Sequence, residues 1–243
     1  MTVLGIDTSA VSCGAAVAKD GKIISDSYVN VGLTHSRTLM TVIDSALKNA
    51  ALILNDIDIL AVAAGPGSFT GIRIGVAAIK GMAFDKNIPV YGVSTLHALA
   101  AGVMRENCVI CPVMDARCSQ VYTSLFEFDG ENTNRITDDA PLKLDELEEI
   151  LSKQKKTIVF VGDGIPVVKK YFAEKDINAE YFSSVYSYQH GSGVALLASM
   201  LYNNGVKPIS ADDLFPIYLR LSQAERERNQ KQKGETQNDS NRQ

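Results

Sequence analysis

The stretch 61–84, AVAAGPGSFTGIRIGVAAIKGMAF, runs from an apolar strand through a glycine turn into a helix with very few polar side chains. The turn Gly65-Pro66-Gly67 is followed by Ser68 and Thr70, and either hydroxyl can cap the helix. Backbone N–H groups at such a helix start can meet a phosphate. The question is whether this turn carries chemistry, or whether the unusual feature is the apolar helix behind it.

The turn matches neither familiar phosphate motif. Gly71 is followed by Ile72, not by the Lys-Ser/Thr of a P-loop, and Thr70 stands where a dinucleotide-binding turn has its third glycine. Two interpretations stay open, a tight strand-to-helix turn and a phosphate contact. The phosphate contact would use Gly67, Ser68 and Arg73.

The helix after the turn has almost no polar stripe. Between Ile74 and Phe84 the only polar or charged residue is Lys80, whereas a helix on a sheet face normally shows polar residues to water. Small residues at 71, 75 and 78 form a ridge that would let another helix approach closely. The helix is covered either by a second lobe of the chain or by another protein, as exposed apolar patches usually are.

A second helix, expected over 35–54, has a similar apolar surplus beside its main stripe, at Met40, Val42 and Ala51. Two such helices could form half of a four-helix bundle across a dimer. The apolar flank of these two helices is therefore our first candidate for a functional surface.

Hydrophobic patterning predicts an α/β chain in two parts. The elements expected in the first part are strands at 2–6, 13–18, 22–29, 57–64 and 88–93 and helices at 35–54, 70–85 and 95–105. The pattern restarts near 106, and the second part should hold strands at 109–114, 121–128 and 157–161 and helices at 144–151, from 166, and at 194–202. This repeat predicts lobes at 1–105 and 106–222, with the end of the second packing back on the first. Residues 223–243 have almost no apolar side chain and are expected to be a disordered tail.

The composition of the chain argues against some classes of function. The chain has 243 residues, is 46% hydrophobic and has a net charge of −4, which argues against gripping nucleic acid unaided. There is no basic leader and no apolar run of about 20 residues, so we expect a cytoplasmic protein without a membrane contact. The spacing Cys108-Val-Ile-Cys111 falls along a strand and favours buried thiols over a redox or zinc site.

Few side chains form a catalytic pattern. The turn in GIDTSAVSCG offers Asp7, Thr8 and Ser9, which either hold metal and phosphate or simply form a turn. The three histidines have no obvious partner: His35 opens a helix, His97 lies in an apolar helix and His190 precedes a glycine-rich turn.

Several segments resemble the TsaB (YeaZ) family of bacterial tRNA threonylcarbamoyladenosine biosynthesis proteins. They are LGIDTSAVSCGAAV, AAGPGSFTGIRIGVAAIKGMA, GVSTLHALA, VMDARCSQVYTSLF and PIYLR, and the likeness spans about residues 1–222. GPGSFTGIR and DAR..VY are the specific motifs. The resemblance implies the two-lobe fold of the sugar kinase, Hsp70 and actin (ribonuclease H-like) group, a duplication with mixed sheets flanked by helices.

The resemblance also implies a role. Members of this family are non-catalytic partners of TsaD, which transfers the threonylcarbamoyl group from threonylcarbamoyl-AMP to adenine 37 of tRNAs that read ANN codons. The ATPase TsaE joins the assembly, and a homodimer forms when TsaD is absent. No cofactor of its own is expected, although ATP or ADP could lie at the TsaD contact or enter through TsaE, and tRNA is met only through the complex.

By this resemblance the two helices form the contact with TsaD. The expected interface residues are His35, Leu39, Met40, Ile43, Gly71, Ile72, Gly75, Ala78, Ile79 and Met82. Gly75→Glu or Ile79→Glu should then abolish binding and leave the monomer folded.

The resemblance also shows departures. TsaD-like members bind a metal through two histidines four apart, but the matching positions here are His35 and Leu39, and VGDGI is the nearest substitute for a run of three glycines that holds adenosine. The alternatives are a small-molecule kinase, with Asp7 placing metal and Thr8, Ser9 and Gly67 contacting phosphate, and a metal-dependent hydrolase.

Overall fold

The computed structural model describes residues 1–84, 86–117, 119–182 and 187–220, and the expected tail over 223–243 lies outside these ranges. The strands are β1 Thr2–Asp7, β2 Cys13–Lys19, β3 Lys22–Val29, β4 Ile59–Gly65, β5 Val90–Ser94, β6 Cys108–Asp115, β7 Gln120–Thr123, β8 Phe126–Phe128, β9 Thr133–Arg135, β10 Ala140–Lys143, β11 Thr157–Val161 and β12 Ala179–Tyr181. The helices are α1 His35–Asn49, α2 Phe69–Ala83, α3 Thr95–Ala101, α4 Leu144–Leu151, α5 Ile165–Phe172 and α6 Gly191–Asn203. Short 3-10 turns span η1 Leu54–Asp56 and η3 Ala211–Asp213.

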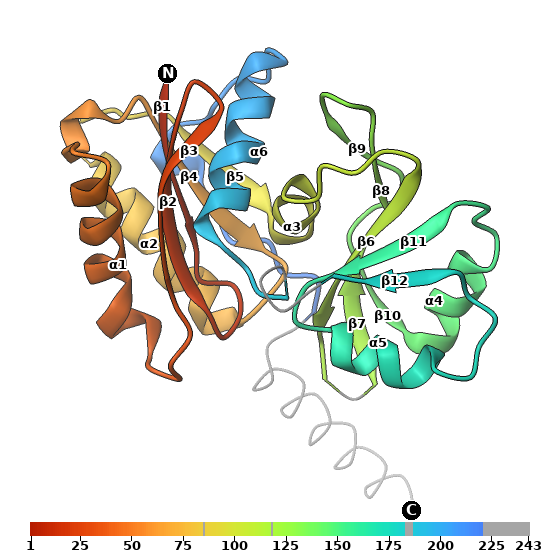
Figure 1. Cartoon of the computed structure of the whole chain (residues 1–243). Helices are drawn as coiled ribbons and strands as arrows, with labels where there is room; N and C mark the ends of the chain where they lie inside the picture. The colour runs from red at the N-terminus through yellow and green to blue at the C-terminus, as the bar shows by residue number, and fades with distance from the viewer. Residues whose placement is uncertain (85, 118, 183–186, 221–243) are drawn as a thin grey trace, which may run out of the picture.

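The first sheet has the strand order β3-β2-β1-β4-β5. β1 and β2 are antiparallel, as are β2 and β3, whereas β4 and β5 run parallel to β1. α1 and α2 cover one face, and α3 and α6 cover the other (Figure 1). Because both faces are covered, β1 and β4 are buried along their whole length, which explains their unbroken apolar runs.

The second sheet repeats the central order of the first. Its path β7-β6-β11-β12 has the same directions as β2-β1-β4-β5: one antiparallel pair followed by two parallel pairs. β10 extends it beyond β7, and β8 pairs with β6. α4 and α5 pack on one face, and α3 lies between the two sheets (Figure 1). The predicted α/β duplication with mixed sheets is confirmed.

α6 returns to the first sheet after the second is complete. A side chain on Gly5 of β1 would come within 2.5 Å of the backbone nitrogen of Ala195, and one on Gly191 would come within 2.6 Å of Ala15. The helix therefore lies directly on β1 and β2, at a distance that only glycine allows. The sequence pattern did not show this close approach.

Most predicted elements are present, with shifted ends. Strand 22–29, helix 144–151 and strand 157–161 have the predicted limits. α1 stops at Asn49 instead of 54, because Ala51 adopts a positive φ of 55° that no helix continues through. The predicted strand 121–128 is broken at Ser124 and Leu125, whose polar groups bond to Thr137. β9, β10 and β12 have only three or four residues, too few for a periodic signal.

α2 presses its glycines against the turn between β1 and β2. A side chain on Gly71 would collide with the carbonyl oxygen of Thr8, and one on Gly75 would come within 2.5 Å of the Thr8 hydroxyl. The ridge at 71, 75 and 78 is thus not a contact for another molecule at its first two positions. Gly81, by contrast, points into open space.

Within the described residues, no helix has the length and hydropathy needed to cross a membrane.

The three glycines of α2 give a matched test of this packing. Gly71→Ala and Gly75→Ala should each lower the free energy of unfolding by roughly 1–3 kcal/mol, since the added methyl group meets atoms that are already in contact. Gly81→Ala should raise it by about 0.5–1 kcal/mol, because alanine is the better helix former and nothing obstructs it. Urea denaturation measures all three, and equal effects at the three sites would contradict this packing.

Candidate functional site

The turn between β1 and β2 uses its polar side chains internally. The Thr8 hydroxyl donates to the carbonyl oxygen of Gly71 at 2.8 Å, across to α2. Ser9 donates to one carboxylate oxygen of Asp7 twice, from its hydroxyl at 2.6 Å and its backbone N–H at 2.8 Å. All three residues are buried. The hydroxyl groups of Thr8 and Ser9 donate to protein atoms and are not available to donate to a phosphate.

The glycine turn joins the same contact. The backbone N–H of Ser68 donates to the carbonyl oxygen of Ser9 at 2.6 Å, and a side chain on Gly67 would collide with that same oxygen. Ser68 is the N-cap of α2, as predicted, and accepts from the N–H of Gly71. The structure therefore brings Asp7, Thr8, Ser9, Gly67 and Ser68 together, but as a packed and hydrogen-bonded junction.

Arg73 does not join that junction. Its Nε donates to the Tyr218 hydroxyl at 2.8 Å, and its guanidinium lies 3.9 Å above the ring of Phe69. Its charge is directed along the outer side of α2, so it does not complete the expected phosphate contact.

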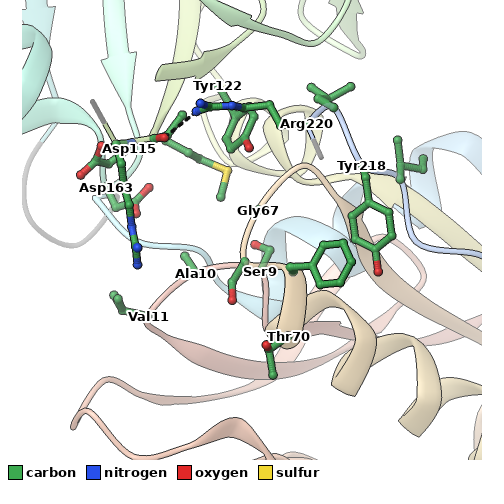
Figure 2. Close-up of a pocket in the computed structure, with 17 residues that line it drawn as sticks. Ser9, Ala10, Val11, Gly67, Thr70, Asp115, Tyr122, Asp163, Tyr218 and Arg220 are labelled. Carbon is green, nitrogen blue, oxygen red and sulfur yellow. Dashed lines mark hydrogen bonds between the residues drawn. The ribbon is translucent and has the colours of Figure 1, made fainter. Parts of the chain in front are cut away.

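A cavity of about 630 Å³ lies between the lobes, beside the junction (Figure 2). The first lobe contributes the tips of its two turns, and the second contributes Asp115, Arg117 and Asp163. The far wall is the chain from Ile217 to Arg220, and Arg220 donates to the carbonyl oxygen of Ala116 at 2.7 Å (Figure 2).

ATP with its metal, which the wider fold group implies, fits this cavity poorly. Gly162 and Gly164 would supply the adenosine side, but side chains there would meet the backbone of Val113, so these glycines serve packing against β6. Asp115 and Asp163 line the cavity together with Arg117 and Arg220, so its walls carry both signs of charge and not the consistent positive charge that a triphosphate needs. Among the described residues there is also no cluster of three or more His, Cys, Asp or Glu side chains arranged to hold a metal.

Two buried carboxyl groups have raised pKa values. Burial raises the pKa of Asp7 to about 6, against the opposing effect of the Ser9 hydrogen bonds. Burial also raises the pKa of Asp163 to about 6, although Gln189 donates to it at 3.0 Å. The two carboxyl groups repel each other, which raises the pKa of Asp7 further. They make the region between the lobes sensitive to pH near neutrality.

The histidines have structural partners. His35 hydrogen-bonds the carbonyl oxygen of Ala10 at 2.8 Å, and His97 does the same with Thr133 at 2.9 Å while its ring stacks on Phe126. Burial lowers the pKa of His97, which favours its neutral form. His190 stacks on the ring of Tyr28.

The two thiols of the Cys108–Cys111 pair are free and buried. Burial raises the pKa of Cys111 to about 12, so it is a thiol at neutral pH and a poor nucleophile. The interpretation as buried thiols is confirmed for this pair.

The single chain already covers most of the expected interface residues. Those buried beneath α1 and α2, against the first sheet or its turn, are Leu39, Ile43, Gly71, Ile72, Gly75, Ile79 and Met82. His35 and Ala78 are half-buried, and Met40 is 57% exposed. The structure therefore corrects the expectation for Gly75→Glu and Ile79→Glu: each would put a charge into the core and unfold the chain.

The segment 211–220, which we call the strap, follows a course along α2 that the sequence did not predict. Leu214 is buried in the first lobe, the backbone N–H of Ile217 donates to Ala64 at 2.7 Å, and Arg220 reaches the second lobe. The strap thus runs along α2 and then joins the lobes. Its run LFPIYL was the available signal, because three aliphatic residues and two aromatics seldom occur together in a plain linker.

The raised carboxyl pKa values predict a pH dependence of stability. A carboxyl whose pKa is higher in the folded than in the unfolded state binds more protons when folded, so stability falls as pH rises from about 4 to 6. Asp163→Asn should remove part of that fall, whereas the exposed Asp176→Asn should follow the wild type. The free energy of unfolding by urea, measured across this range, tests it. Parallel curves for Asp163→Asn and wild type would contradict the burial of this charge.

The sequence is similar to that of known proteins over most of its length. The family model described as TsaD, tRNA N6-adenosine threonylcarbamoyltransferase, matches residues 30–228. The tRNA threonylcarbamoyladenosine biosynthesis protein TsaB of Bacillus subtilis is 32% identical over 93% of this chain and 96% of its own length. TsaB of Escherichia coli is 32% identical over 68% of this chain and 72% of its own.

A solved structure extends the likeness to three dimensions. A Pseudomonas aeruginosa protein described as similar to the peptidase YeaZ has a TM-score of 0.78 and 25% identity, covering 90% of this chain and 99% of that one. The Bacillus relative matches nearly end to end at the sequence level. The chain therefore belongs to the TsaB (YeaZ) family of tRNA threonylcarbamoyladenosine biosynthesis proteins.

Proposed function

We propose that this chain is a non-catalytic subunit that docks TsaD through the outer faces of α1 and α2 and so supports threonylcarbamoyl transfer to adenine 37 of tRNA. The observation that carries the proposal is the outer face of α2. With the core positions turned inward, the helix still has Ala77 and Gly81 exposed and Ile74 and Ala78 half-buried. Met40 of α1 adds a large apolar side chain to the same flank.

This face suits a helix partner. Its residues are small or apolar, which allows close approach, and a specific interface of standard size buries about 1,600 Å² in total. The proposed contact thus uses the two helices expected from the sequence but different residues on them. These residues are Met40, Ile74, Ala77, Ala78 and Gly81. The same face would pair two copies of this chain where TsaD is absent.

The chemistry of the transfer would lie with the partner. The hydroxyl groups of the β1–β2 turn are already bonded inside the chain, and the cavity between the lobes is a poor fit for ATP. We therefore assign this chain no cofactor of its own. ATP or ADP would enter at the TsaD contact or through TsaE, and the assembly would work in the cytoplasm.

Charge placed on the outer face should block docking and leave the fold intact. Met40→Glu and Ala77→Glu sit at exposed positions, so the free energy of unfolding should change by no more than about 0.5 kcal/mol. Co-purification with TsaD should drop at least tenfold, because a carboxylate would have to lose its water at an apolar contact.

Two variants serve as controls for that experiment. Ile24→Glu on β3 is also exposed and belongs to neither helix, and it should bind TsaD like the wild type. Ile79→Glu, at a core position, should instead fail to fold. Undiminished TsaD binding by Met40→Glu and Ala77→Glu together would refute docking through this face.

A second measurement concerns the division of labour. Reconstituted tRNA modification by TsaD should require this chain, while titration of the isolated chain with Mg-ATP should give no binding below millimolar concentration. Submillimolar binding would favour a small-molecule kinase instead, and full modification in the absence of the chain would remove its supporting role.

A further inference from the structure

A second surface lies on the other flank of α2, where the strap runs beside the helix. It consists of two ring–cation units, and we call it the strap ridge; its residues are Phe69, Arg73, Lys80, Phe215 and Tyr218. In the first unit Arg73 lies 3.9 Å above Phe69, which stacks on Tyr218 with ring centroids 4.2 Å apart. In the second unit the Lys80 ammonium lies 4.7 Å from the ring of Phe215.

The two units repeat along the helix. Arg73 and Lys80 are seven residues apart, so they lie on the same side of α2 about 10.5 Å from each other. The strap passes in the opposite direction and gives one ring to each cation, Tyr218 to Arg73 and Phe215 to Lys80. The result is a row of aromatic rings and positive charges with a regular spacing along α2.

The two cations are not neutralised. Arg73 donates to the Tyr218 hydroxyl and Lys80 to the backbone carbonyl oxygen of Asp212, and within the described part of the chain neither forms an ion pair with a carboxylate. The nearest acids along the strap are Asp212 and Asp213 in η3, at the Lys80 end. The Arg73 end continues toward the guanidinium of Arg220.

The rings are open to solvent as well. Phe215 is 67% exposed and Tyr218 is 38% exposed. Exposed aromatic rings beside cations without a carboxylate partner are the combination that binds single-stranded nucleic acid, where bases stack on rings and cations meet phosphates. A helix partner would find a poorer match here, because two unpaired cations would need to be desolvated.

We propose that the strap ridge contacts a single-stranded segment of tRNA within the assembled complex. The proposal rests on the proposed function, since a chain with a net charge of −4 is not expected to hold RNA alone. Bases would stack on Phe215 and Tyr218, and backbone phosphates would lie near Arg73 and Lys80. The ridge borders the docking face along α2, because Ala77 of that face lies four residues after Arg73 and three before Lys80.

The test uses the complex of this chain with TsaD and fluorescently labelled tRNA, with affinity measured by anisotropy at several salt concentrations. Phe215→Ala should weaken tRNA binding at least fivefold, because an aromatic ring on which a base stacks is lost. Lys80→Gln should weaken it and reduce the salt dependence by about one phosphate contact. Tyr202→Ala and Lys48→Gln, an exposed ring on α6 and an exposed cation on α1, are the matched controls and should leave tRNA affinity unchanged.

TsaD co-purification is measured first for every variant. Normal TsaD binding with weakened tRNA binding supports the strap ridge as an RNA contact. Loss of TsaD binding in Phe215→Ala or Lys80→Gln would show that the ridge is a protein contact and overturn the inference. Unchanged tRNA affinity in both variants would overturn it too.

A second readout separates this inference from the proposed function. Photo-cross-linking of tRNA that contains 4-thiouridine, followed by peptide mapping, should identify the peptide that carries Phe215 and Tyr218. If wild-type chain fails to bind TsaD, the docking proposal is wrong, and the strap ridge is then judged on this cross-link in a mixture of chain, TsaD and tRNA. Cross-links confined to other peptides would contradict it.

Discussion

The contact between Thr8 and Gly71 determines how the first lobe is arranged. The Thr8 hydroxyl donates to the Gly71 carbonyl oxygen, and the absence of a side chain at Gly71 lets the two backbones meet. Gly75 continues this contact one turn later. The contact fixes the rotation of α2 about its axis, so it decides which residues of an almost wholly apolar helix are buried and which face solvent.

The same contact explains why the polar groups of the two turns are bonded inside the chain. The backbone N–H of Ser68 donates to the carbonyl oxygen of Ser9, and the Ser9 hydroxyl donates to the Asp7 carboxylate. In a helix start that binds an anion the N–H groups are free to point outward. Here one of these groups, the N–H of Ser68, is bonded to the carbonyl oxygen of Ser9, and the turn packs against its neighbour. The family takes part in tRNA modification, which agrees with functional residues on the surface of this chain.

The strap adds a constraint between the lobes. Its apolar residue Leu214 is anchored in the first lobe, whereas Arg220 bonds to the Ala116 carbonyl of the second. It also forms a wall of the cavity, where Asp163 is buried. α2 therefore has two different flanks, one smooth and apolar and one lined with rings and cations, and a single helix could serve two partners.

The sequence by itself determined the α/β class, the repeated hairpin, most elements, and the family, because hydrophobic periodicity and short motifs are local properties of the chain. It also directed attention to α1 and α2. It could not decide which side of α2 faces outward: Gly75 and Gly81 look alike in sequence, yet one touches Thr8 and the other open space. Nor could it show that residues 211–220 run along α2, or that burial raises the pKa values of Asp7 and Asp163. Those features depend on contacts between residues far apart in the chain, which only the tertiary structure brings together.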